Sequence, residues 1–450
     1  MTTSAAALPT ARQRVLNVLL QVQAGAYADV ALHRTLALAP LSDSDRAFAT
    51  ELVYGTVRRQ RTLDALIDQL GTRPANQQPP VLRLVLHLGL YQLRYLAVPA
   101  SAAVNTSVDL AKANGLGRLS GVVNGILRQY DRQAAKGDPL VLPDQPAVAL
   151  GVGHSYPDWL TELWVTQLGP QEADQLCQWF NQVPSIDLRV NRQRTTVEQV
   201  QVAFAAAGVA VEPLAGVPFG LRLVNHQGAI TLLPGYSEGW WSVQDASAQL
   251  VGLLLDPQPG DTVLDVCAAP GGKATQMAEI LGNQGKVWAC DRAPSRLKKI
   301  TANAARLGLD NLQIRPGNST DLTPFHHQAD RVLVDAPCSG LGTLHRHADA
   351  RWRQTPESIA GLATLQSALL NEAARCVQPG GTLVYATCTL HPAENEAVIE
   401  AFCRAHPTWQ PCPPPPDFGH NLEIAPEGWV KVWPHRQNMD GFFMVRLRQI

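Results

Sequence analysis

From residue 256 onwards, short apolar runs that are typical of strands alternate with longer stretches that have apolar residues at helical spacing. This alternation is the pattern of a mostly parallel sheet covered by helices. The predicted strands are residues 262–266, 286–290, 312–315, 331–334 and 382–386, and residues 429–433 and 442–447 predict a terminal hairpin. The sequence therefore predicts a C-terminal α/β domain over residues 251–450.

The preceding half of the chain has a different pattern. Residues 8–135 have apolar residues at helical spacing, separated by glycine and proline at 71–74 and 115–117, which predicts an all-α bundle over residues 1–140. Residues 141–250 begin with a linker and then mix predicted helices with predicted strands, which indicates a small α+β subdomain. Its predicted helices are residues 159–168 and 197–207, and its predicted strands are 186–190 and 220–224. A multidomain chain fits the length of 450 residues.

Composition excludes several classes of protein. With 46% hydrophobic residues and a net charge of −1, the chain is not expected to be disordered. The most apolar stretch, residues 81–98, contains Arg83, His87 and Arg94, so we predict an amphipathic helix and no membrane partner. Eight cysteines without a C-x-x-C pair, and no recognisable signal peptide, favour a reducing cytoplasm. We expect a cytoplasmic monomer.

Charge is distributed unevenly along the chain. Residues 1–140 hold 15 Lys and Arg against 9 Asp and Glu, a charge of +6, which leaves −7 for the remainder. A basic N-terminal module indicates a polyanionic partner, although an ordinary basic surface would give the same count. Arg58, Arg59 and Arg61 are candidates for phosphate contacts, and a solvated helix face is the alternative reading.

The first motif with chemical meaning is VLDVCAAPGGK, residues 263–273. A predicted strand enters a turn of small residues, and a helix is predicted from Ala274. Small residues let backbone N–H groups approach a ligand closely, and a helix N-terminus favours negative groups. The motif is not a P-loop, because Cys267 and Ala274 replace the required glycine and hydroxyl residues, and it lacks the G-x-G-x-x-G dinucleotide fingerprint.

Asp291 ends the next predicted strand, where a carboxylate can accept hydrogen bonds from ribose hydroxyls. This arrangement predicts a site for a nucleoside without a pyrophosphate, with S-adenosylmethionine as the leading candidate. A tight turn followed by a surface acid is the alternative reading.

Two cysteines follow predicted parallel strands directly, at the sheet edge where open α/β folds bind their ligands. Cys338 lies in DAPCSG, residues 335–340, and Cys388 lies in TCT, residues 387–389. Either thiol is a candidate nucleophile, and the residues alone do not say which one attacks. We interpret five other cysteines as buried apolar residues: Cys177, Cys267, Cys290, Cys376 and Cys403.

These segments resemble motifs I, IV and VI of the RNA cytosine-5 methyltransferases of the NOL1/NOP2/Sun family. LRVN at 188–191, WSVQD at 241–245 and DGFF at 440–443 extend the resemblance, and ELVYGTVR at 51–58 and VNGILR at 123–128 resemble the NusB-like RNA-binding domain. The resemblance implies a NusB-like bundle followed by a Rossmann-like class I methyltransferase. It also implies the Sun-type group of bacterial enzymes that act on 16S rRNA.

The resemblance also implies roles for individual residues. Cys388 would be the nucleophile, Cys338 would assist release of the adduct, and Asp335 would bind the N3/N4 edge of cytosine with Lys273 beside it. S-adenosylmethionine would be held by Cys267, Ala268, Ala269, Pro270, Gly271, Gly272, Lys273, Asp291, Asn318 and Asp335. Asn318 stands where the family has aspartate, although its amide oxygen can still accept from an adenine amino group.

The expected function is therefore methylation of cytosine C5 in 16S rRNA, free or in an early pre-ribosomal form. Alternatives are the same reaction on tRNA or 23S rRNA, and a non-catalytic RNA-binding assembly factor. The intact motif cysteines argue against the last of these. His154, His345, His347 and His435 have no ligand spacing, so no metal is expected.

Overall fold

The computed structural model describes residues 10–38, 41–225, 228–416, 418–419 and 422–450. The chain divides into two compact units. The helical unit comprises Met1–Gln182 and Leu344–Arg353, and the sheet unit comprises Val183–Thr343 and Gln354–Ile450. Residues 8 and 9, the start of the predicted helical stretch, lie outside the described residues.

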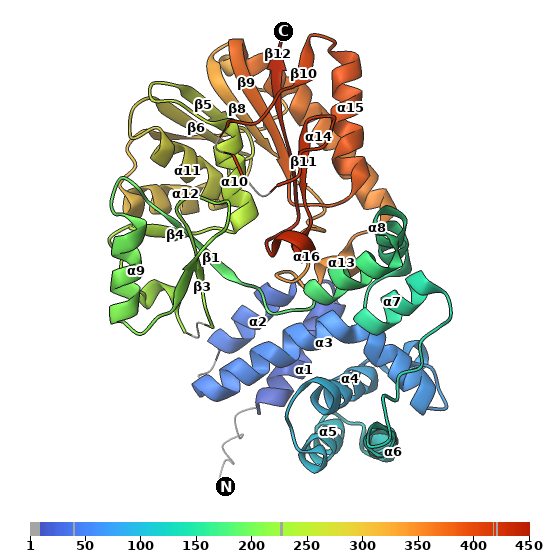
Figure 1. Cartoon of the computed structure of the whole chain (residues 1–450). Helices are drawn as coiled ribbons and strands as arrows, with labels where there is room; N and C mark the ends of the chain where they lie inside the picture. Colours follow the sequence, from blue (N-terminus) through green and yellow to red (C-terminus); the bar gives the residue numbers. More distant parts are fainter. Residues whose placement is uncertain (1–9, 39–40, 226–227, 417, 420–421) are drawn as a thin grey trace. The chain divides into compact units, whose positions relative to one another are not determined.

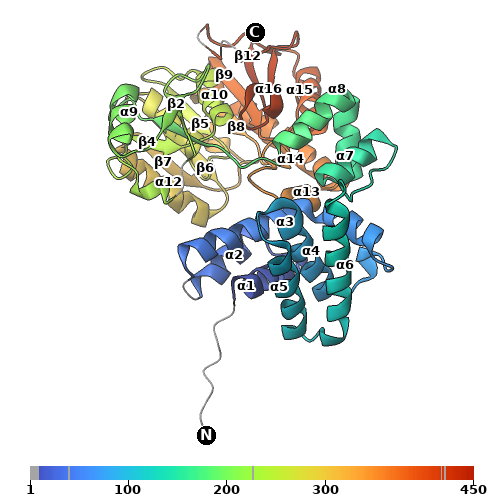
Figure 2. The same ribbon diagram turned by 60° about the horizontal axis from the view of Figure 1, so that its bottom comes forward.

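The helical unit confirms the predicted all-α bundle (Figure 2). Its apolar stripes meet in one core that includes Leu16, Leu52, Leu63 and Leu86. Ser42 caps α3 by accepting from the backbone N–H of Asp45, which supplies an acceptor that the first helical turn lacks. The bundle helices are α1 (Ala11–Gln23), α2 (Ala28–Ala37), α3 (Asp43–Leu70), α4 (Pro80–Tyr95), α5 (Ala100–Ala113) and α6 (Ser120–Ala134), with short 3₁₀ turns at Ala75–Gln77 and Gly117–Leu119.

Two further helices, α7 (Pro146–His154) and α8 (Asp158–Trp179), follow the linker in the same unit. The predicted helix at 159–168 is confirmed as the first part of α8, which bends where Gly169, with φ of +77°, precedes Pro170. None of the helices among the described residues is long and apolar enough to cross a membrane.

A segment from far along the chain completes the helical unit. Leu344–Arg353, which ends in the short helix α13 (Ala350–Arg353), packs among the N-terminal helices. Arg351 is fully buried and donates to Ser155 O and Asn181 Oδ1, each at 3.1 Å, and the Trp352 indole donates to Val57 O at 2.8 Å. The sequence pattern did not predict this placement.

Within the sheet unit, a small antiparallel sheet has the strand order β2-β3-β1-β4. The predicted α+β character is confirmed, since the predicted strands at 186–190 and 220–224 and the predicted helix at 197–207 are all present. The elements are β1 (Ile186–Val190), α9 (Val197–Ala206), β2 (Val211–Pro213), β3 (Gly220–Leu223), a 3₁₀ turn (Ile230–Leu232) and β4 (Trp241–Val243). The sequence analysis missed β2 and β4, which are only three residues long.

The larger sheet has the order β10-β12-β9-β8-β5-β6-β7, with β11 paired to β12 (Figure 1). The strands β9-β8-β5-β6-β7 are parallel, and β12 joins them antiparallel. This confirms the Rossmann-like prediction and the terminal hairpin. The strands are β5 (Thr262–Asp265), β6 (Lys286–Asp291), β7 (Leu312–Pro316), β8 (Ala329–Asp335), β9 (Val377–Thr387), β10 (Trp409–Pro411), β11 (Trp429–Val432) and β12 (Phe442–Gln449).

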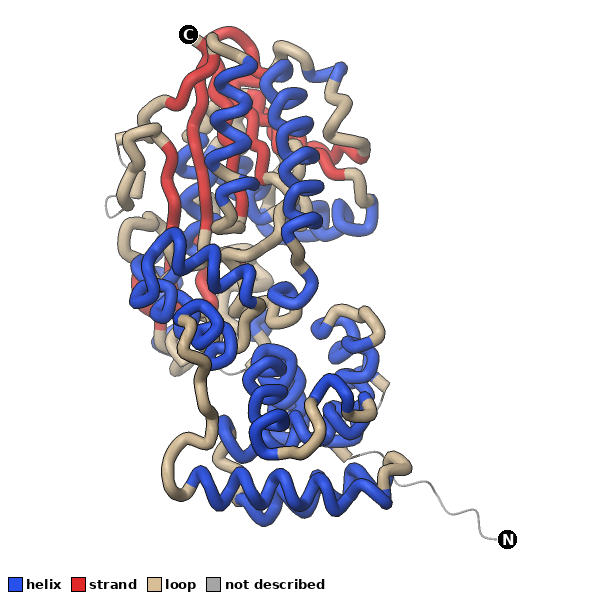
Figure 3. The backbone as a smooth tube through the Cα atoms, turned by 90° about the vertical axis from the view of Figure 1, so that its right-hand side faces the viewer, coloured by secondary structure: helices blue, strands red, loops and turns tan. Residues whose placement is uncertain are grey.

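Helices cover both faces of this sheet (Figure 3). One face packs against α10 (Ala246–Leu255), α11 (Gly272–Ile280) and α12 (Pro294–Leu307), and the other against α14 (Pro356–Cys376) and α15 (Glu396–Ala405). Short elements at the ends of strands are 3₁₀ turns at Thr323–Phe325 and Pro392–Glu394 and the helix α16 (Pro434–Gln437). The prediction that a helix starts at Ala274 was wrong by two residues, because Gly271, with φ of +107°, already turns the chain into α11.

Candidate active site

A cavity of about 300 Å³ lies at the carboxyl ends of the parallel strands. This is where an open α/β sheet leaves a crevice, because the strand order reverses between β5 and β8. Eight of the predicted site residues line it, and they lie at or after the ends of the five parallel strands β5 to β9: Cys267, Ala269, Lys273, Asp291, Asn318, Asp335, Cys338 and Cys388. The remaining predicted residues are not among the lining residues: Ala268, Pro270 and Gly271 lie in the turn after β5, and Gly272 begins α11.

The turn between β5 and α11 is shaped by close packing. Gly271 leaves no room for a Cβ, since one built there would contact the side chain of Ile300 in α12. Arg296 of α12 donates to Ala269 O at 2.6 Å and lies 3.7 Å from a carboxylate oxygen of Asp291. The 269–270 peptide bond is cis. The small residues of the motif thus let the turn pack against α12 while its other side faces the cavity.

Asp291 and Asn318 bring an acidic and an amide group to the cavity lining. Asp291 is 6% exposed, and one of its oxygens accepts from Ala293 N at 2.8 Å. Asn318 is exposed, and its side-chain oxygen accepts from Thr320 N at 3.2 Å. Arg292 and Ser319 line the cavity beside them.

Lys273 and Asp335, which also line the cavity, form an ion pair, with 2.8 Å between Lys273 Nζ and Asp335 Oδ2. The ammonium group also lies 4.9 Å from the centre of the Phe442 ring. Burial lowers the pKa of Lys273, but the charges of Asp335 and Cys388 outweigh it, so the pKa is raised above its usual value. Lys273 is therefore a fixed cation in the cavity wall.

The two motif cysteines meet in this cavity. Their Sγ atoms are 3.4 Å apart because β8 and β9 are parallel neighbours, with Asp335 opposite Ala386 in the register. The loops are also joined through backbone, since Gly342 N donates to Cys388 O at 2.9 Å. The hydrogen bond to Cys388, burial, and the negative charges of Cys388 and Glu394 raise the pKa of Cys338 well above its usual value. Cys338 therefore keeps its proton at neutral pH.

The other cysteines mostly match their interpretation as buried apolar residues. Cys177, Cys290 and Cys376 are buried, and burial raises the pKa of each thiol. Cys267 and Cys403 match it only in part, because they are half-buried side chains packed against the apolar core. Cys267 faces the cavity because it follows the end of β5, although burial and nearby carboxylates raise its pKa as well.

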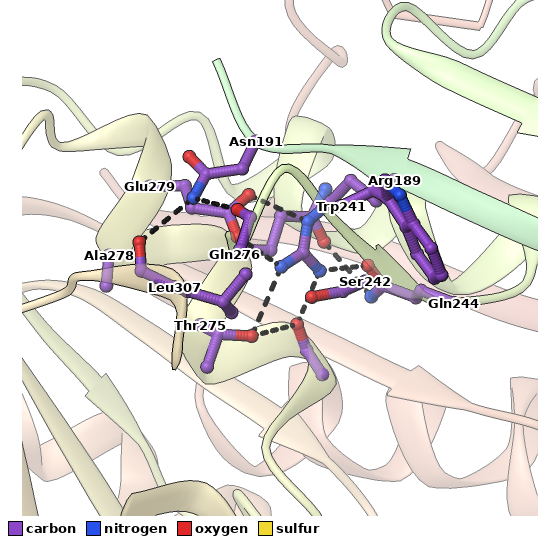
Figure 4. A network of polar contacts seen from close by, with 12 residues as sticks. Arg189, Asn191, Trp241, Ser242, Gln244, Thr275, Gln276, Ala278, Glu279 and Leu307 are labelled. Carbon is purple, nitrogen blue, oxygen red and sulfur yellow. Dashed lines mark hydrogen bonds and ion pairs between the residues drawn. The ribbon is translucent and has the colours of Figure 1, made fainter. Parts of the chain in front are cut away.

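A buried polar network connects the small sheet to the start of α11, directly after the turn between β5 and α11 (Figure 4). Arg189 of β1 makes a two-point ion pair with Glu279 of α11, with N–O distances of 2.8 and 2.9 Å. It also donates to Gly272 O at 2.7 Å and to the side chains of Gln244 and Thr275. The LRVN and WSVQD segments thus fix the start of α11 rather than line the cavity.

The cavity residues fit the predicted methyl donor. Asp291 and Asn318 supply acceptors for hydroxyl and amino groups. Directly before the turn, Asp265 is fully buried, and neither carboxylate oxygen has a hydrogen-bond partner of good geometry among the described residues. An unpaired buried carboxyl is costly, so a site that holds one is suited to a ligand with an amino group or positive charge.

Several cavity residues were not assigned from sequence. Phe442 belongs to the DGFF segment, which was noticed only through the family resemblance, and Arg296, Leu365 and Leu369 carry no local motif. Their helical spacing in α12 and α14 is the only signal, and it does not say which sheet edge the helices reach.

In the helical unit, the arginines that are candidates for phosphate contacts are partly occupied by contacts within the unit. Arg61 donates to Tyr156 O and pairs with Asp158 at 2.6 Å, and Arg58 donates to His345 O at 3.1 Å. Arg59 lies over the Tyr95 ring at 4.9 Å. All three are half-buried, and Arg58 and Arg61 donate to groups within the unit, so the phosphate contacts stay a prediction. His154 pairs with Asp174, and the described residues contain no group of three or more potential metal ligands.

Sequence profiles of known families cover most of the chain. The profile described as 16S rRNA methyltransferase RsmB/F matches residues 252–448, the NusB family matches 9–132, and the RsmF/B-like ferredoxin-like domain matches 156–229. The three matches follow the order of elements described above.

Whole-chain relatives agree with the profiles. The probable ribosomal RNA small subunit methyltransferase B of Synechocystis sp. is 51% identical over 446 residues, covering 98% of this chain and 99% of the relative. The corresponding protein of Serratia proteamaculans is 37% identical over 411 residues, covering 90% and 91%. The crystal structure of PH0851 has a TM-score of 0.79 at 25% identity, covering 99% of this chain and all of that one. The chain therefore belongs to the RsmB/F family of 16S rRNA methyltransferases, which depend on S-adenosylmethionine.

Proposed function

We propose that this protein methylates C5 of one cytosine in 16S rRNA through a covalent adduct between Cys388 and the base. The observation that carries the proposal is the pair of Sγ atoms 3.4 Å apart in the same cavity as the Lys273–Asp335 ion pair. A methyl transfer to oxygen or to an exocyclic nitrogen would not need two thiols there.

The chemistry of cytosine explains the need for a thiol. C5 is a poor nucleophile until the Cys388 thiolate adds to C6, forming a C–S bond and breaking the C5–C6 double bond. The resulting enamine carbon can then take a methyl group, and S-adenosylmethionine supplies that group as an electrophile. Removal of the C5 proton by a base sends its electron pair into the C5–C6 bond and expels the Cys388 thiolate.

The neighbouring groups support these steps. Asp335 would bind the N3/N4 edge of the cytosine, and Lys273 would hold its carboxylate in place. Cys338, which retains its proton, would donate to the Cys388 sulfur and assist release of the adduct. The turn Cys267–Ala268–Ala269–Pro270–Gly271–Gly272, together with Asp291 and Asn318, would hold the methyl donor.

The expected substrate is unpaired RNA, free or in an early pre-ribosomal form. A base inside a helix cannot reach a cavity of this kind, so the cytosine must leave its stack. The +6 charge of residues 1–140 supports an electrostatic contribution to RNA affinity from the helical unit.

The cysteine assignment is tested with labelled S-adenosylmethionine and unmodified 16S rRNA. Cys388→Ala should lower methyl transfer by roughly 1000-fold or more, because the attacking group is gone. In Cys338→Ala, Cys388 should still attack the cytosine, but the methylated RNA should be released slowly. An RNA–protein adduct should therefore accumulate and be visible on denaturing gels. Cys403→Ala, a half-buried cysteine outside the cavity, is the matched control and should behave as wild type.

Other outcomes would change the conclusion. An adduct that survives Cys388→Ala but not Cys338→Ala would exchange the two roles. Label only in tRNA or 23S rRNA would keep the chemistry and replace the target. Binding of the methyl donor without transfer to any free RNA would favour a pre-ribosomal particle as substrate or the assembly-factor alternative.

A further inference from the structure

Glu394 is a fully buried acid directly behind the two cysteine loops. It ends the 3₁₀ turn Pro392–Glu394 that follows β9. Acidic residues are almost never fully buried unless their oxygens are satisfied. Its hydrogen-bond partners among the described residues are N–H and O–H donors, so its position reflects specific hydrogen bonding.

The donors come from both cysteine loops. Ser339, next to Cys338, donates to Glu394 through its backbone N–H at 2.9 Å and also through its hydroxyl. Thr389, next to Cys388, has its hydroxyl 3.3 Å from Glu394 and 2.8 Å from the Ser339 hydroxyl. One carboxylate therefore contacts the residue that follows each cysteine.

The helix α14 and the next residue of the chain complete this arrangement. Gln366 of α14 donates to Glu394 at 2.9 Å and to Pro337 O, one residue before Cys338, at 3.0 Å. Asn395 accepts from the Thr387 hydroxyl at 2.6 Å and donates to Thr389 O at 2.9 Å, on either side of Cys388. Both loops are thus fixed from behind by buried hydrogen bonds.

We propose that Glu394 is a positioning residue for methyl transfer, which holds the Cys338 and Cys388 loops so that the two sulfur atoms stay in contact. This inference rests on the proposed function, since it assumes that both thiols take part. Glu394 touches neither sulfur through a hydrogen bond and acts through Ser339 and Thr389.

Charge adds a second effect to the geometry. The negative charge of Glu394 is one of the causes that raise the pKa of Cys338, after the hydrogen bond to Cys388, burial and the charge of Cys388. Glu394 thereby helps to keep the proton on Cys338. Removing the charge should lower the pKa of Cys338.

The test compares Glu394→Gln with Glu396→Gln, two residues further on, whose carboxylate pairs with Lys431 outside this network. Single-turnover methyl transfer should fall roughly 10- to 100-fold in Glu394→Gln, while the Kd for S-adenosylmethionine and the KM for RNA stay within about twofold. The pH midpoint for alkylation of Cys338 should also fall in this variant alone. A merely structural defect would also weaken binding, so unchanged values of Kd for S-adenosylmethionine and KM for RNA beside slower transfer identify a positioning role.

If Glu394→Gln fails to fold, Ser339→Ala decides the question, since it removes only one hydroxyl and should slow transfer by roughly 3- to 10-fold. The inference would be overturned if the tested variant had the same rate of methyl transfer and the same pH midpoint for Cys338 alkylation as Glu396→Gln. Wild-type protein incubated with RNA that contains 5-fluorocytidine separates the two hypotheses, because C5 then carries no removable proton and the adduct persists. No wild-type adduct would refute the proposed function, whereas an adduct with an unaffected Glu394→Gln variant would refute only the role of Glu394.

Discussion

At the scale of single residues, burial of Asp265 makes the stability of the ligand-free protein depend on pH. Burial and the neighbouring charge of Asp335 raise its pKa to about 8, far above the usual value for aspartate. Between about pH 4 and 8 the folded protein therefore holds a proton that the unfolded chain has lost. Stability must fall as pH rises through this window, because the folded state binds more protons than the unfolded state.

Asp265→Asn tests this directly in the ligand-free protein. The variant cannot ionise, so its free energy of unfolding should gain on that of wild type as pH rises from 5 to 8, by about 3–4 kcal/mol in total. Denaturant unfolding at several pH values measures the difference, from which the contributions of groups that do not interact with Asp265 cancel. A difference that stays constant with pH would contradict the assignment.

The cavity also shows which site residues a sequence can predict. The strands that carry Asp265, Asp335 and Thr387 are buried on both faces, so they form continuous apolar runs and the residues after them are easily placed at the sheet edge. Glu394 has no such signal. Its role depends on Ser339, which is 55 residues away in sequence.

At the scale of elements, the Arg189–Glu279 pair holds the small sheet against α11. Both side chains are at most 5% exposed, and Arg189 satisfies the carbonyl oxygen of Gly272 at the start of the helix. Breaking a buried pair leaves an uncompensated charge, which costs more than the loss of an exposed pair.

Arg189→Ala should therefore lower the free energy of unfolding by about 3–5 kcal/mol. Arg404→Ala, which removes a partner from an exposed pair with Glu400, should change it by less than about 1 kcal/mol. Urea unfolding gives both values. Equal effects for the two variants would show that the network does not stabilise this junction.

The elements that escaped prediction share a physical cause. β2 and β4 are three residues long, too short to establish a period, and β4 is paired only because β1 lies beside it. β10 is equally short, and it ends at Pro411 on the edge of the sheet, where a missing N–H is tolerated.

At the scale of the whole molecule, the chain crosses between its two units more than once. The segment Leu344–Arg353 begins six residues after Cys338, yet it belongs to the helical unit. Nothing in its local pattern predicts this, because a buried arginine looks like a surface residue until its partners are known. The predicted domain boundaries at residues 140 and 250 stay predictions. Neither of them anticipates that a segment beyond residue 250 belongs to the helical unit.

Arg351→Ala should loosen the helical unit, because Ser155 O and Asn181 Oδ1 would lose a buried donor. We expect faster amide hydrogen exchange in α7 and α8, with β5–β9 unchanged and Arg404→Ala as the control. Faster exchange confined to the sheet unit would contradict the placement of this segment.

The most direct test of the central claim is methyl transfer from labelled S-adenosylmethionine to unmodified 16S rRNA, with tRNA and 23S rRNA in parallel. Bisulfite sequencing maps the product. The account predicts one 5-methylcytosine, in 16S rRNA, that is absent with Cys388→Ala. Methylation at another atom or in another RNA, or unchanged methylation with Cys388→Ala, would contradict it.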